Sequence, residues 1–388
     1  MKRNLFNRQT LVVAGTAALL AGCQVVPKTG PSTTQGPASG PTPEPSATAL
    51  PTDQTRHRVA LLVPMTGRNG AVGQALANAA NMALLDTNAS NLRITTYDTA
   101  SGASAAATKA LSDGNRLILG PLMAENILSV SPLAQRANVP VISFSNDSSA
   151  AGNNVFVMGH IPEQSINRSV AYARSKGASR FGAVVPNGEY GSRSMSALSS
   201  ALSEYGGSLV GSERYSRGNT SVVSAAQRLK SRGGYDTVLI ADGASLATRA
   251  AAELKSGASG TRILGTELWG GEGSLTRSSA MRGAIFSAVS DSRFKRFSSS
   301  YENRFGRKPY RISSLGYDAV LLTLRISREW KVGRIFPVAR MREEDGFVGV
   351  DGAFRFKRSG VIERALAVVE VREGGFTTVD QAPSSLAN

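Results

Sequence analysis

The sequence predicts an α/β protein with two lobes, each a mostly parallel sheet flanked by helices. Two observations support this prediction. Strand-like apolar runs alternate with amphipathic helical segments, and this alternation is typical of right-handed βαβ units. About 330 residues follow a Pro-rich segment near the N-terminus, which is too many for one small core and suits two lobes of roughly 150 residues each.

The first predicted strand and turn set the pattern for the rest of the chain. Residues 59–63 form a continuous apolar run, as expected for a parallel strand that is covered on both faces. Pro64 ends this strand because proline has no N–H to donate. Gly67, Gly70 and Gly73 then allow a tight turn. Ligands of open α/β sheets bind at the carboxyl ends of strands, where this turn lies.

The same alternation continues through two successive blocks, which imply two sheets. In the first block we expect strands at 92–97, 116–119, 139–143 and 155–158, and helices at 72–83, 103–111 and 124–137. In the second block we expect strands at 180–185, 208–214, 236–240, 262–264 and 284–289, and helices at 163–175, 192–205, 220–230 and 244–255. Two helices without an intervening strand, 294–305 and 313–329, are expected to return to the first lobe, and 352–356 should pair with 364–371 as a hairpin.

The N-terminus has the features of an export signal. Lys2, Arg3 and Arg8 precede an apolar stretch, 11–20, that is too short to span a bilayer. The stretch ends in Leu20-Ala21-Gly22-Cys23, which resembles the bacterial lipobox. We therefore predict a signal peptide over 1–22 and lipidation at Cys23, with an ordinary signal peptide as the alternative. Since Cys23 is the single cysteine, no disulfide can form within the chain.

The residues after the lipobox predict where the protein is anchored and how far it reaches. Gln24 takes the place where Asp usually signals retention in the inner membrane of Gram-negative cells, so we predict the periplasmic face of the outer membrane. Residues 23–56 are rich in Pro, Thr, Ser, Gly and Ala and cannot bury enough apolar surface to fold. They predict a tether that extends up to about 3.1 Å per residue.

The chain is basic, with a formal charge of +16 that falls to +13 when the three basic residues of the signal are removed. The excess is concentrated in 277–342, where fifteen Lys and Arg residues stand against four acids. This region is either a surface for an anionic envelope partner or a set of solvated helix faces, and we prefer the solvated faces. No aromatic-interleaved basic motif supports nucleic-acid binding.

Residue content argues against several enzyme classes. His57 and His160 are the two histidines, so a His-rich metal site is ruled out and no Ser-His-Asp order is convincing. The glycine turn lacks the Gly-x-Gly-x-x-Gly spacing of dinucleotide sites, and an exported protein lacks a nicotinamide pool. The spacing of the acidic residues does not exclude a pair of carboxylates that hydrolyses glycosides, but no feature of the sequence indicates a particular pair. We predict no enzyme, no cofactor and no metal.

Six short motifs occur in order along the predicted folded region. They are Val63-Pro64-Met65-Thr66-Gly67, Ile118-Leu119-Gly120-Pro121-Leu122, Val139-Pro140-Val141-Ile142-Ser143-Phe144-Ser145, Tyr190-Gly191, Gly316-Tyr317-Asp318-Ala319-Val320 and Gly346-Phe347-Val348-Gly349-Val350-Asp351-Gly352-Ala353-Phe354-Arg355-Phe356. Together they resemble the type I periplasmic binding proteins of the leucine/isoleucine/valine-binding kind, and most of all the penicillin-binding-protein activator lipoproteins. The resemblance implies a two-lobe type I periplasmic binding fold with three crossovers and a ligand cleft.

Domain boundaries follow from this resemblance and from the predicted elements. The first lobe is expected to comprise 57–160 and 290–333, and the second lobe 161–289 and 334–375. A disordered tail is expected at 376–388.

The resemblance also implies ligand-contacting residues on four loops. Ala124 lies in the loop that follows the third strand, and Ser145 and Asn146 match a second carboxylate-binding loop. Tyr190 matches a cleft aromatic, and Glu267 matches the acid that pairs with a ligand ammonium group.

Two neighbours of these residues complicate the assignment. Amino-acid receptors usually have Ser in the loop that here reads Met123-Ala124-Glu125, and Glu125 would repel a ligand carboxylate. Trp269 either floors the cleft or packs in the core.

Two functions follow as expectations. The preferred one is a non-catalytic cell-envelope lipoprotein that regulates peptidoglycan synthesis as penicillin-binding-protein activators do, by contact with a peptidoglycan synthase. Known activators often carry an additional N-terminal helical-repeat domain, whereas this chain has a Pro-rich tether there. The alternative is a solute receptor for an ABC permease that binds an amino acid or a similar small polar ligand.

Overall fold

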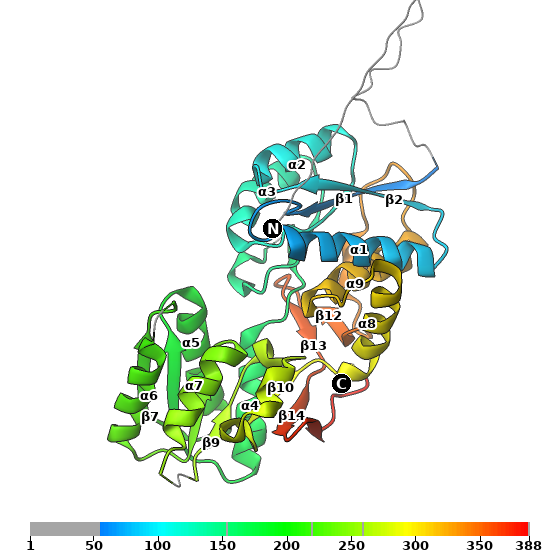
Figure 1. The fold of residues 1–388 in the computed structure, drawn as a ribbon. Coiled ribbons are helices and arrows are strands. Elements are labelled where there is room, and N and C mark those ends of the chain that lie inside the picture. Colours follow the sequence, from blue (N-terminus) through cyan, green and yellow to red (C-terminus); the bar gives the residue numbers. More distant parts are fainter. Residues whose placement is uncertain (1–54, 153, 219, 258–259, 387–388) are drawn as a thin grey trace, which may run out of the picture. The chain divides into compact units, whose positions relative to one another are not determined.

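The computed structural model describes residues 55–152, 154–218, 220–257 and 260–386 (Figure 1). The predicted signal peptide, the lipidation site Cys23 and nearly all of the tether lie outside the described residues. Within the described residues, no helix is both long enough and apolar enough to cross a membrane.

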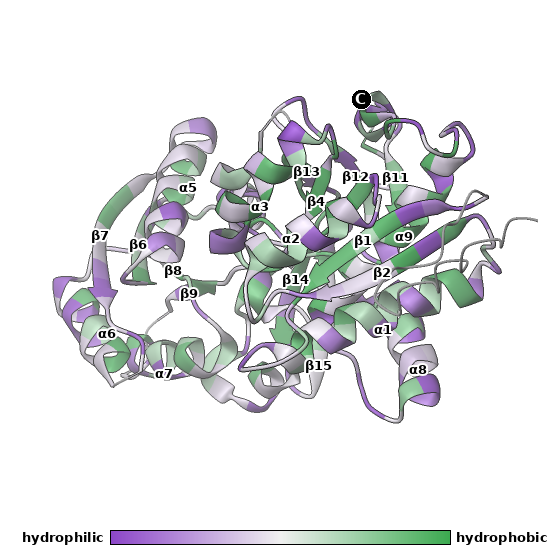
Figure 2. Ribbon diagram, turned by 90° about the horizontal axis from the view of Figure 1, so that it is seen from above, coloured by the Kyte–Doolittle hydropathy of each residue, from purple (hydrophilic) through white to green (hydrophobic). Residues whose placement is uncertain are grey.

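The first lobe is built on a five-stranded parallel sheet in the order β2-β1-β3-β4-β5. Its strands are β1 (His57–Val63), β2 (Leu92–Asp98), β3 (Leu117–Leu119), β4 (Val141–Ser143) and β5 (Val155–Val157), and its helices are α1 (Gly70–Asp86), α2 (Ala103–Ser112) and α3 (Ala124–Arg136). In Figure 1, α2 and α3 lie on one side of β1 and α1 on the other. The interior strand β1 is buried almost throughout, whereas the edge strand β2 is more polar (Figure 2).

The second lobe contains a seven-stranded sheet in the order β15-β14-β10-β9-β8-β6-β7. Its strands are β6 (Arg180–Pro186), β7 (Ser208–Tyr215), β8 (Thr237–Ile240), β9 (Arg262–Leu264), β10 (Ile285–Ala288), β14 (Ala367–Arg372) and β15 (Gly375–Asp380). Helices α4 (Pro162–Ser175), α5 (Glu189–Tyr205), α6 (Ser221–Arg232) and α7 (Ala244–Leu254) flank it. Strands β6 to β10 pair in parallel, while β14 and β15 are antiparallel to their neighbours.

The same strand-to-helix turn occurs once in each lobe and depends on glycine. A Cβ on Gly73 would lie 1.7 Å from the carbonyl oxygen of Pro64, and a Cβ on Gly191 would lie 1.8 Å from that of Pro186. Any side chain larger than hydrogen would therefore push α1 or α5 off the end of its strand.

The chain passes between the two lobes three times, as the fold prediction requires. The passages follow β5, β10 and β13 (Ile362–Arg364). Helices α8 (Asp291–Phe305) and α9 (Ser314–Ser327) return to the first lobe, as the prediction from the sequence states. Phe297 and Tyr301 of α8 pack with Met82 of α1, and Leu315 of α9 lies in the first-lobe core.

The expected boundary at residue 334 is wrong for the next segment. Strands β11 (Phe347–Gly349), β12 (Gly352–Phe356) and β13 form a small antiparallel sheet. Its rings belong to the first-lobe core, and Phe356 stands edge-on to Phe156 of β5 with centroids 5.3 Å apart. Burial of these aromatic side chains against β5 places the segment in the first lobe instead of the second.

Two further expectations about the C-terminal region need correction. Strand β12 pairs with β13, so the predicted hairpin exists, but 367–371 belongs to β14 in the other sheet. Strand β15 pairs with β14 from Gly375 to Asp380, so the predicted disordered tail is wrong for these residues. The backbone groups of β15 are satisfied by this ladder, which the polar side chains of the strand do not reveal.

Candidate ligand cleft

A pocket of about 460 Å³ opens where residues from both lobes meet. Four of the five residues that the sequence suggested for ligand binding line it: Ala124, Ser145, Asn146 and Glu267. Its volume lies in the ordinary range for small-molecule sites.

The first-lobe wall is formed where strands β3 and β4 end. Helix α3 begins at Ala124, and Glu125 lines the same pocket. Ser145 is 4 % exposed, and its Oγ accepts a hydrogen bond from the backbone N–H of Asp147 at 3.0 Å. The carbonyl oxygen of Asn146 is engaged by Arg193, so this loop is held from the second lobe as well.

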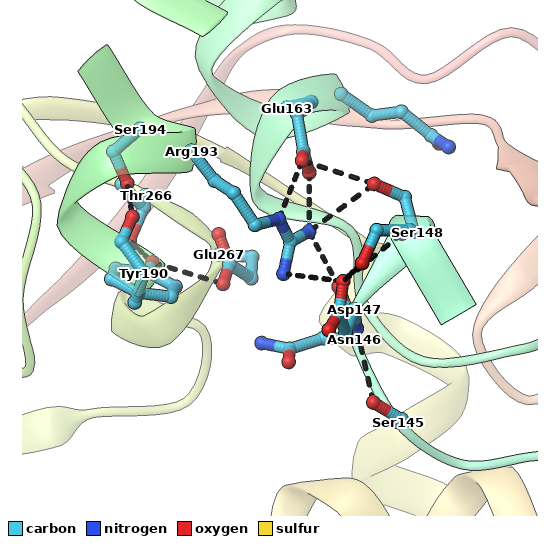
Figure 3. A network of polar contacts seen from close by, with 12 residues as sticks. Ser145, Asn146, Asp147, Ser148, Glu163, Tyr190, Arg193, Ser194, Thr266 and Glu267 are labelled. Carbon is cyan, nitrogen blue, oxygen red and sulfur yellow. Dashed lines mark hydrogen bonds and ion pairs between the residues drawn. The ribbon is translucent and has the colours of Figure 1, made fainter. Parts of the chain in front are cut away.

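Glu267 forms part of the second-lobe wall and lies in a short 3₁₀ turn after β9. Tyr190 Oη donates to Glu267 Oε1 at 3.0 Å and lies 2.8 Å from Thr266 Oγ1 (Figure 3). Glu267 Oε2 is buried and has no hydrogen-bond partner among the described residues. Burial raises the pKa of Glu267 to about 8, so its carboxyl group is mostly protonated at neutral pH.

Tyr190 acts differently from the cleft aromatic that the resemblance suggested. It is absent from the lining of the pocket, and its hydroxyl points to Glu267 and Thr266 (Figure 3). Burial first, and then the nearby Glu267, raises the pKa of the Tyr190 phenol, so this group stays protonated and remains a donor. Tyr190 thus orients the acid and lies outside the lining of this pocket.

Arg193 is a residue of the site that sequence reasoning missed. Its guanidinium binds Glu163 through two contacts of 2.8 Å and donates to the carbonyl oxygen of Asn146 at 2.7 Å (Figure 3). It also lies 3.7 Å from Asp147. Arg193 therefore ties α5 of the second lobe to the loop after β4 of the first. It follows Tyr190 by three residues, a helical spacing that puts both on one face and could have drawn attention to it.

A second set of missed residues surrounds Asp351, which is completely buried. Its carboxylate accepts from Arg311 at 2.6 Å and Ser314 at 3.0 Å, and lies 2.7 Å from His160 Nε2. Burial would raise the pKa of Asp351, but Arg311 and His160 hold it well below its usual range. His160 and Arg311 also line the pocket beside Glu267, so this network borders the cleft.

Of the two alternatives for Trp269, the structure places it in the core. The ring is fully buried, its Nε1 donates to the carbonyl oxygen of Asp242 at 2.8 Å, and Phe286 packs against it with centroids 5.8 Å apart. The described residues contain no group of three or more His, Cys, Asp or Glu side chains arranged to hold a metal ion.

Two α/β lobes, three crossovers and a cleft lined from both sides define the class of two-lobed binding proteins. The chain belongs to the periplasmic binding protein family, because a family model of that description matches residues 57–376. The family and fold expected from the sequence motifs are thereby confirmed.

Solved structures show the same fold at low sequence identity. A leucine binding protein from Thermotoga maritima is 19% identical with a TM-score of 0.64, covering 84% of this chain and 98% of that one. A putative branched-chain amino acid ABC transporter protein from Rhodospirillum rubrum is 20% identical with a TM-score of 0.72, covering 84% and 100%. A solute binding protein from R. palustris in complex with benzoate is 16% identical with a TM-score of 0.66, covering 86% and 98%.

One curated relative is an uncharacterized protein of Rickettsia prowazekii. It is 25% identical over 179 residues, which are 46% of this chain and 48% of the relative. The match therefore spans about half the length of the curated relative.

Proposed function

We propose that this protein is a non-catalytic receptor of the cell envelope that binds a small ligand with an apolar body and an amine group. The observation that carries the proposal is Glu267, a buried acid that lines a pocket between two lobes and whose Oε2 has no hydrogen-bond partner among the described residues. An amine would donate to this oxygen, and its positive charge would favour the ionised carboxylate.

The remaining walls of the pocket support an apolar ligand body. They include Val72, Leu122, Met123, Phe144, Leu268 and Ile312. Such a lining supplies the hydrophobic contribution to affinity, while the few polar groups orient the ligand. Structures of this fold bind isoleucine in one case and benzoate in another, so the fold accepts molecules of this size. A receptor of this kind would deliver its ligand to an ABC permease.

Ligand-dependent thermal unfolding of the full chain tests this proposal. We expect L-leucine and 3-methylbutylamine to raise the unfolding temperature and 3-methylbutanoate, which has no amine, to leave it unchanged. A ligand at a hundred times its Kd stabilises the folded state by about 2.7 kcal/mol. The substitution Glu267→Gln should abolish the shift, because an amide cannot neutralise an ammonium group.

Glu272→Gln is the matched control, since Glu272 lines the same pocket but is exposed. The control should retain the shift. Stabilisation by the carboxylate-only compound, or equal loss in both variants, would contradict an amine site at Glu267.

A second candidate is a regulator of peptidoglycan synthesis that resembles the penicillin-binding-protein activators and works by protein contact. It is favoured by the first-lobe loop, where Ala124 offers no hydroxyl and Glu125 places a carboxylate in the pocket. A cleft altered in this way suits a binding module that has changed its role. Crosslinking of the full chain in membranes tests it: recovery of a peptidoglycan synthase is expected, and repeated crosslinking without one would count against the candidate.

The anchoring predicted at Cys23 is part of both candidates. Two or more acyl chains hold a protein stably on a membrane. We expect the wild-type protein to fractionate with membranes and Cys23→Ser to appear in the soluble fraction. Fractionation with the outer membrane would favour the regulator of peptidoglycan synthesis. Fractionation with the inner membrane would instead favour a receptor that works next to its permease.

A further inference from the structure

A turn that follows α9, residues 328–335, exposes apolar side chains among cations. Val332 is 41 % exposed and Ile335 is 63 % exposed. Arg328, Lys331 and Arg334 are exposed in the same turn. Within the part of the chain that the structure describes, none of these three cations has an ion-pair partner. The turn therefore combines an apolar tip with positive charge.

Buried aromatic rings hold this turn in place. Trp330 and Phe336 are both buried, and their ring centroids lie 5.0 Å apart. Trp330 Nε1 donates to the carbonyl oxygen of Arg334 at 2.8 Å, which closes the turn. Gly333 adopts a φ of 77°, in the left-handed region that glycine enters without a steric cost. The exposure of Val332 is thus built into the turn, and the apolar tip is available to a partner outside the chain.

The charges around the turn differ from those within it. The sequence left two alternatives for the basic region 277–342, an anionic partner or solvated helix faces. Arg325 and Arg340 both pair with Glu343, at 3.2 and 3.3 Å, and are therefore neutralised. Glu329, the one acid within 328–335, pairs with Arg340. The cations of the turn keep their charge beside the apolar tip. This combination suits an anionic lipid surface, because phosphate headgroups attract cations and apolar side chains enter the boundary below the headgroups.

The turn lies where the chain enters the first lobe. The ring of His57, the first residue of β1, stacks on Trp330 with centroids 4.1 Å apart. The segment after α9 accordingly runs beside the start of β1 in Figure 1. The predicted tether, 23–56, ends at this point, so an anchor at Cys23 would hold this end of the lobe within reach of the membrane.

The ligand cleft lies at the opposite end of the same sheet. Ala124 and Ser145 line the cleft after the carboxyl ends of β3 and β4, and these strands run parallel to β1. Since β1 has seven residues and spans about 23 Å, contact at the turn leaves the cleft open.

We infer that the 328–335 turn is a docking surface for an anionic phospholipid bilayer. Val332 and Ile335 enter the headgroup boundary, and the cations of the turn contact lipid phosphates. The inference rests on the anchoring proposed at Cys23 but on no ligand in the cleft. A tether raises the local concentration of the turn at the membrane, so a weak contact suffices. Docking would orient the first lobe with its cleft away from the bilayer.

Hydrogen exchange of the mature wild-type protein anchored in vesicles tests the docking surface. Each Lys or Arg near an anionic leaflet strengthens binding about fivefold. The amides of 331–335 should therefore exchange severalfold more slowly on phosphatidylcholine vesicles with phosphatidylglycerol than on phosphatidylcholine alone. The exposed second-lobe turn at 372–374 should exchange equally on both. Equal exchange of 331–335 on both vesicles would overturn the inference, as would slowing by isolated peptidoglycan and not by vesicles.

Substitutions at the tip provide the second test. Val332→Ser combined with Ile335→Ser should abolish the slowing, and both residues are exposed, so the core stays intact. Lys331→Gln should weaken the contact about fivefold. Leu128→Ser is the matched control, because Leu128 is 76 % exposed on α3. Equal slowing in the double variant and the control would show electrostatic attraction of the whole protein and overturn the docking surface.

Flotation with neutral vesicles reports the anchoring separately. Protein that floats but shows no phosphatidylglycerol-dependent slowing keeps the anchor and loses the docking surface. Protein that does not float rejects the anchoring proposed at Cys23. The turn then keeps its role only if the wild-type chain sediments with phosphatidylglycerol vesicles and the double variant does not.

Discussion

Two buried carboxyl groups near the hinge have opposite environments. Asp351 is fully buried and satisfied by Arg311, His160 and Ser314. Glu267 receives a hydrogen bond from Tyr190 on one oxygen, while the other oxygen is buried without a partner among the described residues. Partners hold the pKa of Asp351 well below its usual range, whereas burial raises the pKa of Glu267 to about 8.

The difference separates a structural acid from one that is available for binding. A buried charge whose hydrogen bonds are complete holds its neighbours in place and has no capacity left for a ligand. A buried acid that lacks a partner is costly on its own and gains stability when a donor arrives. The first group lies among the hinge segments and the second lies in the wall of the cleft, which suits these two roles.

The largest expected effect comes from removing the charge of Asp351. Asp351→Asn leaves Arg311 and Arg364 with an uncompensated positive charge, and we expect a loss of about 3–5 kcal/mol in the free energy of unfolding. Urea unfolding of the full chain measures this loss. Asp380→Asn is the matched control, because its ion pair with Arg168 at 2.7 Å is partly exposed and should be worth less than about 1 kcal/mol. Similar losses in both variants would remove the structural role assigned to Asp351.

The next prediction concerns pH. Glu267 holds its proton up to about pH 8 in the folded state, whereas an exposed Glu in the unfolded chain ionises near pH 4.5. The folded state therefore binds more protons between these values, and the stability due to Glu267 falls as the pH rises through this window. The slope is at most about 1.4 kcal/mol per pH unit.

The wild-type stability minus that of Glu267→Gln, measured from pH 5 to pH 8, isolates this slope. Asp318, whose pKa is also raised, contributes with the same sign to both proteins and cancels in the difference. A stability difference that does not change with pH would mean that Glu267 is ionised in the folded state. Glu267 and Asp351 would then no longer differ in their protonation.

The fold could be predicted from the sequence because its signals are local. Apolar runs bounded by Gly and Pro identified β1, β3 and β4, and helical periodicity identified the helices between them. The position of the third passage between the lobes was predicted wrongly, because residues 364–371 read as one continuous strand. The change of sheet occurs at Ala365 and Leu366, and no breaker residue marks it.

The cleft could be predicted in part. Ser145 follows β4 of the first sheet and Glu267 follows β9 of the second, so each lies on a loop at the carboxyl end of its strand, where ligands of such sheets bind. The hinge network could not be predicted from spacing, because His160, Arg311 and Arg364 are far apart in the sequence and only tertiary folding brings them to one cavity. Asp351 lies in the last of the six motifs, but its role depends on Arg311, His160 and Ser314, which the motif does not contain.

Arg193 resembles Asp351 in that it is a charged group with several hydrogen-bond partners, and it joins the two lobes. Arg193→Met removes the bonds to Glu163 and to the Asn146 carbonyl oxygen, and we expect a loss of about 1–3 kcal/mol in the free energy of unfolding. Amide hydrogen exchange in the loop 145–148 should also speed up. Arg214→Met, on an exposed residue of β7, should change neither quantity. Unchanged exchange in the Arg193 variant would show that this contact does not hold the loop.

The smallest expected effect tests whether Tyr190 orients Glu267. Tyr190→Phe removes the hydrogen bond to Oε1, and we expect a loss of about 0.5–1.5 kcal/mol in the free energy of unfolding. Because the Tyr190 hydroxyl favours the ionised carboxylate, its removal should raise the pKa of Glu267 further and move the fall in stability to higher pH. Tyr205→Phe, which removes a hydroxyl that donates to Asn167 on the surface, should leave the pH profile in place. A profile that shifts to lower pH in Tyr190→Phe would mean that the phenol stabilises the protonated acid instead.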